Sequence, residues 1–193
     1  MKARILPFLP GRSGCVVWLT GLSGAGKSTI AEEVCRRLTR QAVAHEYLDG
    51  DAIRAVFPSI GFSRADRDAH VRRVGYLASR LEHHGIVVIA ALVSPYRESR
   101  DFVRSLCGHF LEVHVATPLA ICEGRDVKGL YARARSGRLA GFTGIDDPYE
   151  PPAAPELFID TTEISVETAA SLILATIPAA ASERQQQASS SPR

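Results

Sequence analysis

Gly21-Leu-Ser-Gly-Ala-Gly-Lys27-Ser28 is the stretch of this 193-residue chain that decides its fold. It matches the pattern G-x-x-x-x-G-K-[ST], in which glycines let the backbone curl so that successive N–H groups point at phosphate oxygens. Lys27 then reaches the β- and γ-phosphates of a nucleoside triphosphate, and the hydroxyl of Ser28 completes the coordination shell of Mg²⁺. A glycine-rich turn with an incidental lysine is the alternative interpretation. The nucleotide-binding residues predicted from this stretch are Gly21, Leu22, Ser23, Gly24, Ala25, Gly26, Lys27, Ser28 and Thr29.

The segments on either side fit a loop that joins a strand to a helix. Residues 15–20 form an apolar run typical of a strand buried on both faces, and residues 28–40 carry apolar side chains at helical spacing. Further strands are predicted at 45–48, 86–93, 110–115 and 157–160, and further helices at 66–84, 95–106, from Pro118 onward, and 166–177. In the helix at 66–84 the side chains expected to face inward are Val71, Val74, Leu77, Ala78 and Leu81. This alternation predicts an α/β fold of the P-loop kinase type, with a five-stranded parallel sheet covered by helices on both faces.

Composition narrows the class of protein. Hydrophobic residues make up 46% of the chain and the net charge is +2, so nothing supports a general nucleic-acid or membrane partner. The chain has no apolar run of the ~20 residues that a membrane span needs and no secretory signal, so we expect a cytoplasmic protein. Cys15, Cys35, Cys107 and Cys122 are widely spaced, and we expect small buried side chains rather than a zinc site.

The length favours one domain with short additions at its ends. We expect an N-terminal extension at 1–14, the phosphate-loop domain at 15–178, and a disordered tail at 179–193 that is rich in serine and glutamine. Within the domain, residues 126–155 are rich in glycine, proline and charged side chains, which is typical of a mobile loop segment that covers a site.

The acidic residues indicate which phosphate-loop class is present. The chain has neither an Asn-Lys-x-Asp guanine signature nor a strand that ends in a clear Walker B acid, which argues against a GTPase or a motor. Asp49 and Asp51 instead follow the second predicted strand, whose end lies at the same sheet edge as the phosphate loop. A carboxylate there can accept a proton from a substrate hydroxyl or hold Mg²⁺ through water, as in a small-molecule kinase. An aspartate pair that only turns the chain around Gly50 is the alternative.

Beyond the phosphate loop, a series of segments resembles the adenylylsulfate kinase (APS kinase) family. The segments follow the family's order from residue 15 to about residue 176, which is far more specific than one phosphate loop. They are Leu-Asp-Gly-Asp at 48–51 with Arg54, Gly-Phe-Ser-x-x-Asp-Arg at 61–67, Val-Arg-Arg at 71–73, Ser-Pro-Tyr-Arg at 94–97, Arg-Asp at 100–101, Pro-Leu-x-x-Cys-Glu at 118–123, Arg-Asp-Val-Lys-Gly-Leu-Tyr at 125–131 and Phe-Thr-Gly-Ile-Asp-x-Pro-Tyr-Glu at 142–150.

The resemblance implies a homodimeric enzyme of sulfate assimilation that uses ATP and Mg²⁺. It would transfer the γ-phosphoryl group of ATP to the 3′-hydroxyl of adenylylsulfate and give 3′-phosphoadenylylsulfate (PAPS). Asp51, Lys27 and Ser94 would be catalytic, and Ser28 and Asp51 would hold the metal. Arginines suit the anionic part of this acceptor and aromatic side chains suit its adenine. The implied acceptor-binding residues are Asp49, Arg54, Phe62, Arg67, His70, Ser94, Pro95 and Phe142.

Two further roles come with the resemblance. Residues 125–150 resemble the family's lid, and Arg125 and Lys128 within this lid segment are expected to contact ATP and help exclude water. Ser94 is marked by the family pattern as a possible phosphoserine intermediate. We favour direct in-line transfer, with Ser94 binding substrate through its hydroxyl, and a helix cap is the third interpretation of this serine.

The sequence departs from the family at the acceptor side. Ala69-His70 stands where the family usually has Glu-Asn, Ala52 replaces an asparagine, and residues 55–60 also diverge. We expect the ring of His70 to donate a hydrogen bond to the acceptor nucleotide and to add positive charge at mildly acidic pH, and a solvent-facing histidine is the alternative. Other functions left open are a kinase of a related nucleotide diester or small alcohol, a catalytically weak nucleotide-binding regulator, and a nucleic-acid binder.

The predicted tail generates a first test. Deletion of residues 180–193 should leave both the activity and the thermal midpoint nearly unchanged, because the segment has too little apolar surface to dock. Activity assays and thermal melts of the full-length and truncated proteins measure this. A large loss of stability would contradict the prediction.

Overall fold

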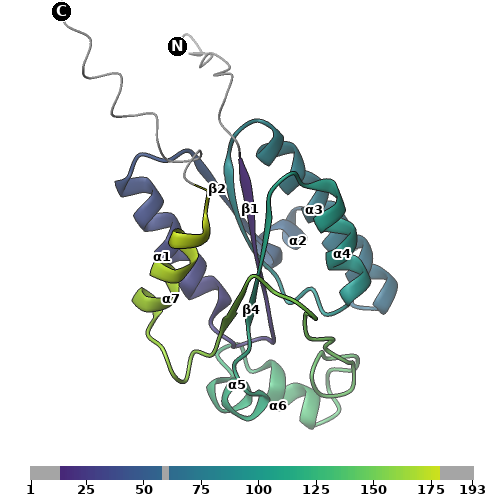
Figure 1. The fold of residues 1–193 in the computed structure, drawn as a ribbon. Helices are drawn as coiled ribbons and strands as arrows, with labels where there is room; N and C mark the ends of the chain where they lie inside the picture. Colours follow the sequence, from purple (N-terminus) through teal and green to yellow (C-terminus); the bar gives the residue numbers. More distant parts are fainter. Residues whose placement is uncertain (1–13, 58–60, 179–193) are drawn as a thin grey trace, which may run out of the picture.

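Five parallel strands form one sheet at the centre of the molecule, which we describe from a computed structural model for residues 14–57 and 61–178 (Figure 1). The strand order is β2-β3-β1-β4-β5 and every neighbouring pair is parallel. The carboxyl ends of all five strands therefore meet at one edge. The strands are β1 at Cys15–Thr20, β2 at His45–Asp49, β3 at Val87–Ala91, β4 at Phe110–Val115 and β5 at Leu157–Ile159.

Helices cover both faces of this sheet. The helices α1 (Lys27–Arg40) and α7 (Val166–Thr176) pack together on one face, and α3 (Arg64–His83) and α4 (Arg97–Leu106) pack together on the other (Figure 1). Three short helices complete the fold: α2 at Gly50–Val56, α5 at Leu119–Arg125 and α6 at Leu130–Arg135. The predicted fold class is thus confirmed.

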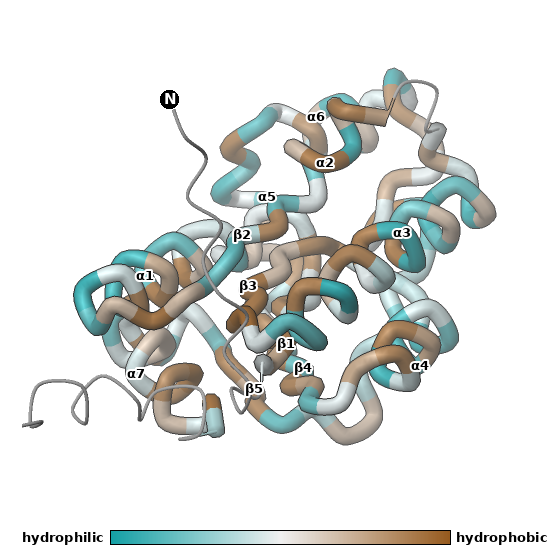
Figure 2. Tube along the Cα trace, turned by 90° about the horizontal axis from the view of Figure 1, so that it is seen from above, coloured by the Kyte–Doolittle hydropathy of each residue, from teal (hydrophilic) through white to brown (hydrophobic). Residues whose placement is uncertain are grey.

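The alternation of side chains along β1 builds two separate cores. Val17 and Leu19 face the α1 side, where they join the core around Ile30. Val16 and Trp18 face the α3 side and pack with the core around Val74. Figure 2 shows the apolar colouring concentrated on the central strands and on the inward surfaces of the helices. Burial on both faces explains why β1 reads as a continuous apolar run.

The structure corrects the sequence predictions in two places. A helix, α2, starts at Gly50 where none was predicted and where a simple turn was the alternative, because Asp49 caps that helix and accepts hydrogen bonds from the backbone N–H groups of Asp51 and Ala52. An aspartate that opens a turn and one that caps a helix give the same sequence signal. In α3, Leu77 was expected to face inward but is 40% exposed, while the nearby Ser79 and Glu82 are buried. The inward stripe of α3 is therefore less apolar than the sequence suggested.

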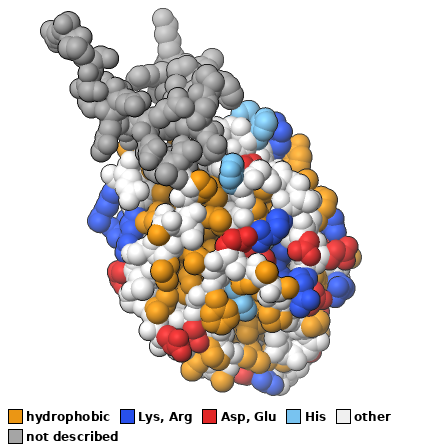
Figure 3. Space-filling view, in the orientation of Figure 1, with side chains coloured by type: hydrophobic (Ala, Val, Ile, Leu, Met, Phe, Trp, Pro, Cys, Tyr) orange, Lys and Arg blue, Asp and Glu red, His pale blue; other side chains and the backbone are white. Residues whose placement is uncertain are grey.

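Several other expectations can be compared with the described part of the chain. Cys15 and Cys122 are buried and Cys35 and Cys107 partly buried, and all four thiols are free. Within residues 14–57 and 61–178 no group of three or more His, Cys, Asp or Glu residues could hold a metal ion, and no helix has the length and apolarity of a membrane span. The face in Figure 3 carries acidic and basic side chains interspersed, in keeping with the small net charge. The predicted tail and residues 1–13 of the predicted extension lie outside the described residues.

Close packing of α3 on α4 yields a stability prediction. A Cβ atom at Gly75 would lie 2.2 Å from the Cγ2 atom of Val103, so the helices touch where Gly75 has no side chain. Gly75→Ala should lower the free energy of unfolding by about 1–3 kcal/mol, the usual cost of overpacking, and depress Tm. Gly124→Ala is the control, because nothing lies within 4 Å of its Cβ position in α5. Equal melting behaviour of the two variants would contradict the close approach.

Candidate active site

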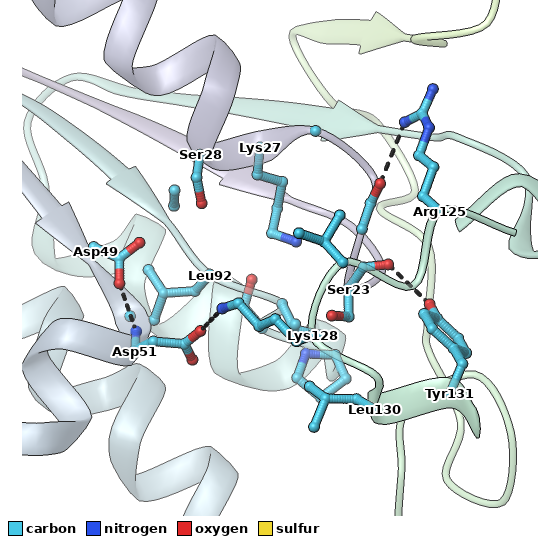
Figure 4. Close-up of a pocket in the computed structure, with 18 of the residues that line it drawn as sticks. Ser23, Lys27, Ser28, Asp49, Asp51, Leu92, Arg125, Lys128, Leu130 and Tyr131 are labelled. Atoms are coloured by element: carbon cyan, nitrogen blue, oxygen red, sulfur yellow. Dashed lines mark hydrogen bonds and ion pairs between the residues drawn. The ribbon is translucent and has the colours of Figure 1, made fainter. Parts of the chain in front are cut away.

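A cavity of about 820 Å³ opens at the carboxyl edge of the sheet. The phosphate loop, the Asp49–Asp51 segment, α3, the end of β3 and the lid segment line it (Figure 4). It brings together nearly all the site residues predicted from the sequence. The exceptions are Gly21, Leu22 and Ala25, which shape the loop but do not line the cavity.

Backbone geometry of the phosphate loop explains two of its glycines. Gly21 follows β1 with φ of +150°, and a Cβ atom there would lie 2.3 Å from the carbonyl oxygen of Val115. Gly26 has φ of +102° and is the N-cap residue of α1. Both positions suit only glycine, and α1 then starts with its positive end at the loop.

Lys27 is held inside this loop. Its ammonium donates to the carbonyl oxygens of Gly21 at 2.9 Å and Leu22 at 2.7 Å. Desolvation lowers the pKa of Lys27 to about 8, although nearby anionic side chains act in the opposite direction. The lysine thus has a destabilised charge in the free protein, which phosphate oxygens would stabilise.

The two candidate carboxylates differ in their contacts. The Oδ1 atom of Asp49 accepts from two backbone N–H groups at the start of α2, and its Oδ2 accepts from the hydroxyl of Tyr47 at 3.2 Å. Asp51 is instead exposed in the cavity, where its Oδ2 lies 2.5 Å from the Nζ of Lys128 (Figure 4). Asp49 therefore serves the local fold, and Asp51 is the carboxylate that chemistry can use.

The charge state of Asp51 follows from its neighbours. Burial alone would raise the pKa of this carboxyl, but the hydrogen bond and charge of Lys128, together with Lys27 and Arg54, hold it below its ordinary value. The hydrogen bond to Asp51 in turn raises the pKa of Lys128. Both groups are charged at neutral pH.

The lid segment rests on the phosphate loop. The hydroxyl of Tyr131 donates to the carbonyl oxygen of Ser23 at 2.9 Å, and Arg125 donates to the carbonyl of Gly24 at 3.2 Å (Figure 4). Tyr131 also packs edge-on against Phe142, with ring centroids 4.9 Å apart. Tyr131 lines the cavity but was not predicted as a site residue, although its place at the end of the Asp-Val-Lys-Gly-Leu-Tyr segment was a signal for it.

Basic and aromatic side chains form the opposite wall. The guanidinium of Arg54 lies over the ring of Phe62 at 4.7 Å from its centroid, and that of Arg67 lies 5.7 Å from the same centroid. Arg67 also reaches the lid segment, where it donates to Thr143 at 3.1 Å and to the carbonyl of Gly141. Phe62 is 58% exposed, which leaves a free aromatic face. The structure thus brings Arg54, Phe62 and Arg67 together as predicted.

His70 is buried in the wall of the cavity. It is 3% exposed, so the solvent-facing alternative is wrong. Its Nε2 lies 3.0 Å from the carbonyl oxygen of Gly50. Burial first, and then the charge of Arg54, lower the pKa of His70, which opposes the expected gain of positive charge at mildly acidic pH.

Ser94 lies at the cavity wall, but its hydroxyl is occupied. It accepts from the indole N–H of Trp18 at 3.1 Å and donates to the hydroxyl of Thr20 at 2.9 Å, and the residue is 2% exposed. The capping interpretation of Ser94 is wrong, since the N-cap of α4 is Tyr96 and the backbone N–H of Arg97 at the start of this helix donates to the carboxylate of Glu150 at 2.8 Å. These contacts favour a positioning role for Ser94 over a nucleophile.

A buried arginine, which was not predicted as a site residue, holds the backbone at Ser94. Arg100, 1% exposed, donates to the carbonyl oxygens of Ser94 and Glu150 at 2.6 Å each and to the carboxylate of Glu112 at 2.7 Å. Ser94 has a φ of +38°, unusual for a residue with a side chain. The Arg-Asp pair at 100–101 belongs to the segments that resemble the family. The burial of Arg100 was not predicted, because a helix with so many charged residues gives no sign of which one is buried.

The site combines a glycine-rich loop, a segment packed on that loop, a carboxylate exposed in the cavity, and a basic and aromatic wall, all at one sheet edge. These are the parts of a phosphate-loop phosphotransferase. Comparisons with known proteins make the assignment specific. The chain belongs to the adenylylsulphate kinase family, whose sequence profile matches residues 13–160. The expected family is confirmed.

Individual relatives agree with this placement. The adenylyl-sulfate kinase of Synechococcus sp. (strain JA-3-3Ab) is 50% identical over 165 residues, which cover 85% of this chain and 94% of the relative. That of Halothermothrix orenii is 46% identical over 164 residues, covering 84% and 89%. Among solved structures, the APS kinase of Mycobacterium tuberculosis in complex with AMPPNP and APS is 40% identical with a TM-score of 0.82, covering 86% of this chain and 98% of that chain. A gluconokinase of Sinorhizobium meliloti, 18% identical over 92% of this chain and 98% of its own, with a TM-score of 0.56, shares the fold alone.

The environment of Lys27 predicts how nucleotide binding depends on pH. Phosphates bind the charged lysine, whose pKa in the free protein is about 8. Below pH 8 Lys27 is already charged in the free protein. Above pH 8 the lysine must take up a proton when ATP binds, so the affinity for ATP falls as pH rises. The Kd for ATP should increase by up to about tenfold per pH unit above this point.

Isothermal titration calorimetry at pH 7 and pH 9, in buffers of different ionisation enthalpy, measures both the Kd and the proton uptake. Lys27→Arg is the control, because an arginine stays charged throughout this range. Equal proton uptake by the two proteins at pH 9 would contradict the assignment.

Proposed function

We propose that this protein transfers the γ-phosphoryl group of ATP to the 3′-hydroxyl of adenylylsulfate and releases PAPS and ADP. The observation that carries the proposal is the single cavity in which Lys27, Asp51 and the Arg54–Phe62 wall meet. Membership of the adenylylsulphate kinase family supports the choice of both substrates. The reaction places the protein in sulfate assimilation.

The chain's own residues supply most of what phosphoryl transfer needs. The phosphate loop and Lys27 bind the ATP phosphates, with Ser28 and Thr29 at the start of α1 and Arg125 and Lys128 from the lid segment. Asp51 orients the 3′-hydroxyl and accepts its proton. Its pKa is held low by its cationic neighbours, so it is ionised and ready for this role when the acceptor binds.

Magnesium fits the donor chemistry of this site. The cavity presents the hydroxyl of Ser28 and the carboxylate of Asp51, both hard oxygen donors, and no larger acidic cluster occurs in the described residues. This small set suits Mg²⁺, which keeps several waters and is held by one or two protein oxygens plus phosphates. When bound, Mg²⁺ neutralises charge on the transferring phosphoryl group.

The acceptor lies against the opposite wall in this proposal. Arg54 and Arg67 bind the anionic phosphosulfate, and Phe62 and Phe142 stack on the adenine. Asp49 and Pro95 shape this part of the cavity rather than contributing charge, because the carboxylate of Asp49 is already used to cap α2. Transfer is direct and in line, since the Ser94 hydroxyl is occupied by Trp18 and Thr20.

The lid segment moves in this proposal. Closure over ATP would carry Lys128 from Asp51 to the phosphates and exclude water. We also propose a cytoplasmic homodimer, which follows from the family resemblance. An APS kinase of Thiobacillus denitrificans that is 37% identical, with a TM-score of 0.65, is described as hexameric, so size-exclusion chromatography with light scattering must decide the assembly.

The direct test is coupled detection of ADP release with ATP, Mg²⁺ and adenylylsulfate. Lys27→Ala is the matched control, because it removes the phosphate-binding ammonium without a core contact. We expect turnover by the wild type and none by the variant. ADP release with another nucleotide diester or a small alcohol, but not with adenylylsulfate, would overturn the proposed acceptor while leaving the kinase class intact.

Asp51 yields a prediction about the chemical step. Asp51→Asn should lower kcat by about 10²-fold or more with ATP binding largely kept, because a positioned base contributes 10²–10⁴-fold to such reactions. Asp49→Asn is the matched control, since asparagine also caps helices well and kcat should change much less. Steady-state kinetics with a separate ATP titration distinguish the two. An unchanged kcat in Asp51→Asn would assign the base role to another group.

A further inference from the structure

The side chain of Arg67 joins the acceptor side of the cavity to the lid segment. Its Nε donates to the carbonyl oxygen of Phe62 at 2.8 Å, and its two terminal nitrogens donate to the hydroxyl of Thr143 at 3.1 Å and to the carbonyl of Gly141. A guanidinium is planar and carries one N–H on Nε and two on each terminal nitrogen. These bonds to described residues therefore leave one N–H on each terminal nitrogen for an anion.

Thr143 is the partner that contacts Arg67 through a side chain. Thr143 is 3% exposed and lies behind the cavity wall, so it contacts Arg67 without lining the cavity itself. Because a guanidinium can only donate, the hydroxyl of Thr143 accepts from Arg67 and its own hydrogen is left for another acceptor. That acceptor is Oδ2 of Asp147 at 3.4 Å. This hydrogen bond is long, and the negative charge of the carboxylate adds a longer-range attraction for the guanidinium.

Asp147 is in turn fixed to the edge of the sheet. The phenol of Tyr96 donates to both of its carboxylate oxygens, at 2.9 Å and 3.2 Å, and Tyr96 is a buried residue between β3 and α4. The backbone between Thr143 and Asp147 is also closed, by a β-bridge and by the N–H of Gly144, which donates to the carbonyl oxygen of Asp147 at 2.7 Å. A continuous chain of contacts thus runs from Tyr96 through Asp147 and Thr143 to Arg67.

We propose that Thr143 and Asp147 are positioning residues, which hold the guanidinium of Arg67 in the orientation that binds the anionic part of the acceptor. This inference rests on the proposed function. Thr143 sets the plane of the guanidinium and Asp147 holds the hydroxyl of Thr143, so neither side chain contacts the substrate. The part of the lid segment at 141–147 therefore belongs to acceptor binding, and ATP binding on the opposite side of the cavity does not depend on this chain of contacts.

The first test removes the hydroxyl of Thr143 and keeps the shape of the side chain. Thr143→Val should raise the KM for adenylylsulfate about tenfold, the effect of losing one hydrogen bond to a charged group, and change the KM for ATP and kcat by less than about twofold. Asp147→Asn should act in the same direction by a smaller factor, because an amide oxygen still accepts a hydrogen bond but carries no charge. Steady-state kinetics with each substrate varied in turn measure these values.

Controls separate positioning of Arg67 from a general effect on the fold. Thr143→Ser keeps the hydroxyl and should retain the wild-type KM for adenylylsulfate. Asp146→Asn changes the neighbouring carboxylate, which accepts only from the backbone N–H groups of Gly141 and Phe142 among the described residues, a task that an amide oxygen also performs. In an Arg67→Ala background, Thr143→Val should change the KM for adenylylsulfate by less than about twofold, because its effect passes through Arg67. Thermal melts report whether any variant is unfolded.

The outcomes distinguish this inference from the proposed function. If wild type phosphorylates adenylylsulfate and folded Thr143→Val has the same KM for it, the positioning role is overturned and the proposed function stands. The same holds if Thr143→Val raises the KM for ATP as much as that for adenylylsulfate, or if it keeps its full effect in the Arg67→Ala background. If wild type does not phosphorylate adenylylsulfate at all, the proposed function fails and this inference fails with it.

Discussion

Parallel pairing of β1 between β3 and β4 is the constraint on which the site depends. It brings segments that are distant in sequence to one edge of the sheet: the phosphate loop after β1, Asp49 and Asp51 at the end of β2, Ser94 after β3 and Thr161 after β5. Each of these positions lies within a few residues of a strand end. The catalytic cavity is therefore a direct result of strand order, and the helices serve to bury the faces of the sheet.

Hydrogen bonds that the active-site residues make to backbone atoms hold this edge in shape. The guanidinium of Arg100 binds two carbonyl oxygens and the carboxylate of Glu112, and both ionic partners are buried. Breaking such a pair by removing one partner typically costs about 3–5 kcal/mol, since the other charge stays buried. These contacts allow Ser94 to keep a positive φ angle, which is unfavourable for a residue with a side chain. The phosphate loop uses glycine for the same purpose, at Gly21 and Gly26.

Much of this could be predicted from the sequence, and the failures have physical reasons. The phosphate loop, the five strands and the position of Asp51 at their carboxyl edge follow from local pattern, which a single sequence carries, whereas Arg54 and Phe62 were expected in the same cavity from the family resemblance. The start of α2 was missed because a capping aspartate and a turn aspartate look alike. The burial of His70, the occupied hydroxyl of Ser94 and the role of Arg100 depend on partners 20, 74 and 50 residues away, which periodicity cannot reveal.

Hydrogen bonds attach both ends of the lid segment to the carboxyl edge of the sheet. Near residue 125 the chain is bonded to the phosphate loop through Arg125 and Tyr131. Near residue 150 it is bonded to Arg100 of α4, which also pairs with Glu112 of β4. The conformational entropy of joining those ends is thus already lost when the domain folds. The entropic cost of closing a loop grows only slowly with the length of the loop. Because the folded domain already holds the two ends together, substrate binding has to offset little of this cost. Insertions between the two attachment points should therefore alter what the segment covers far more than how stably the domain folds.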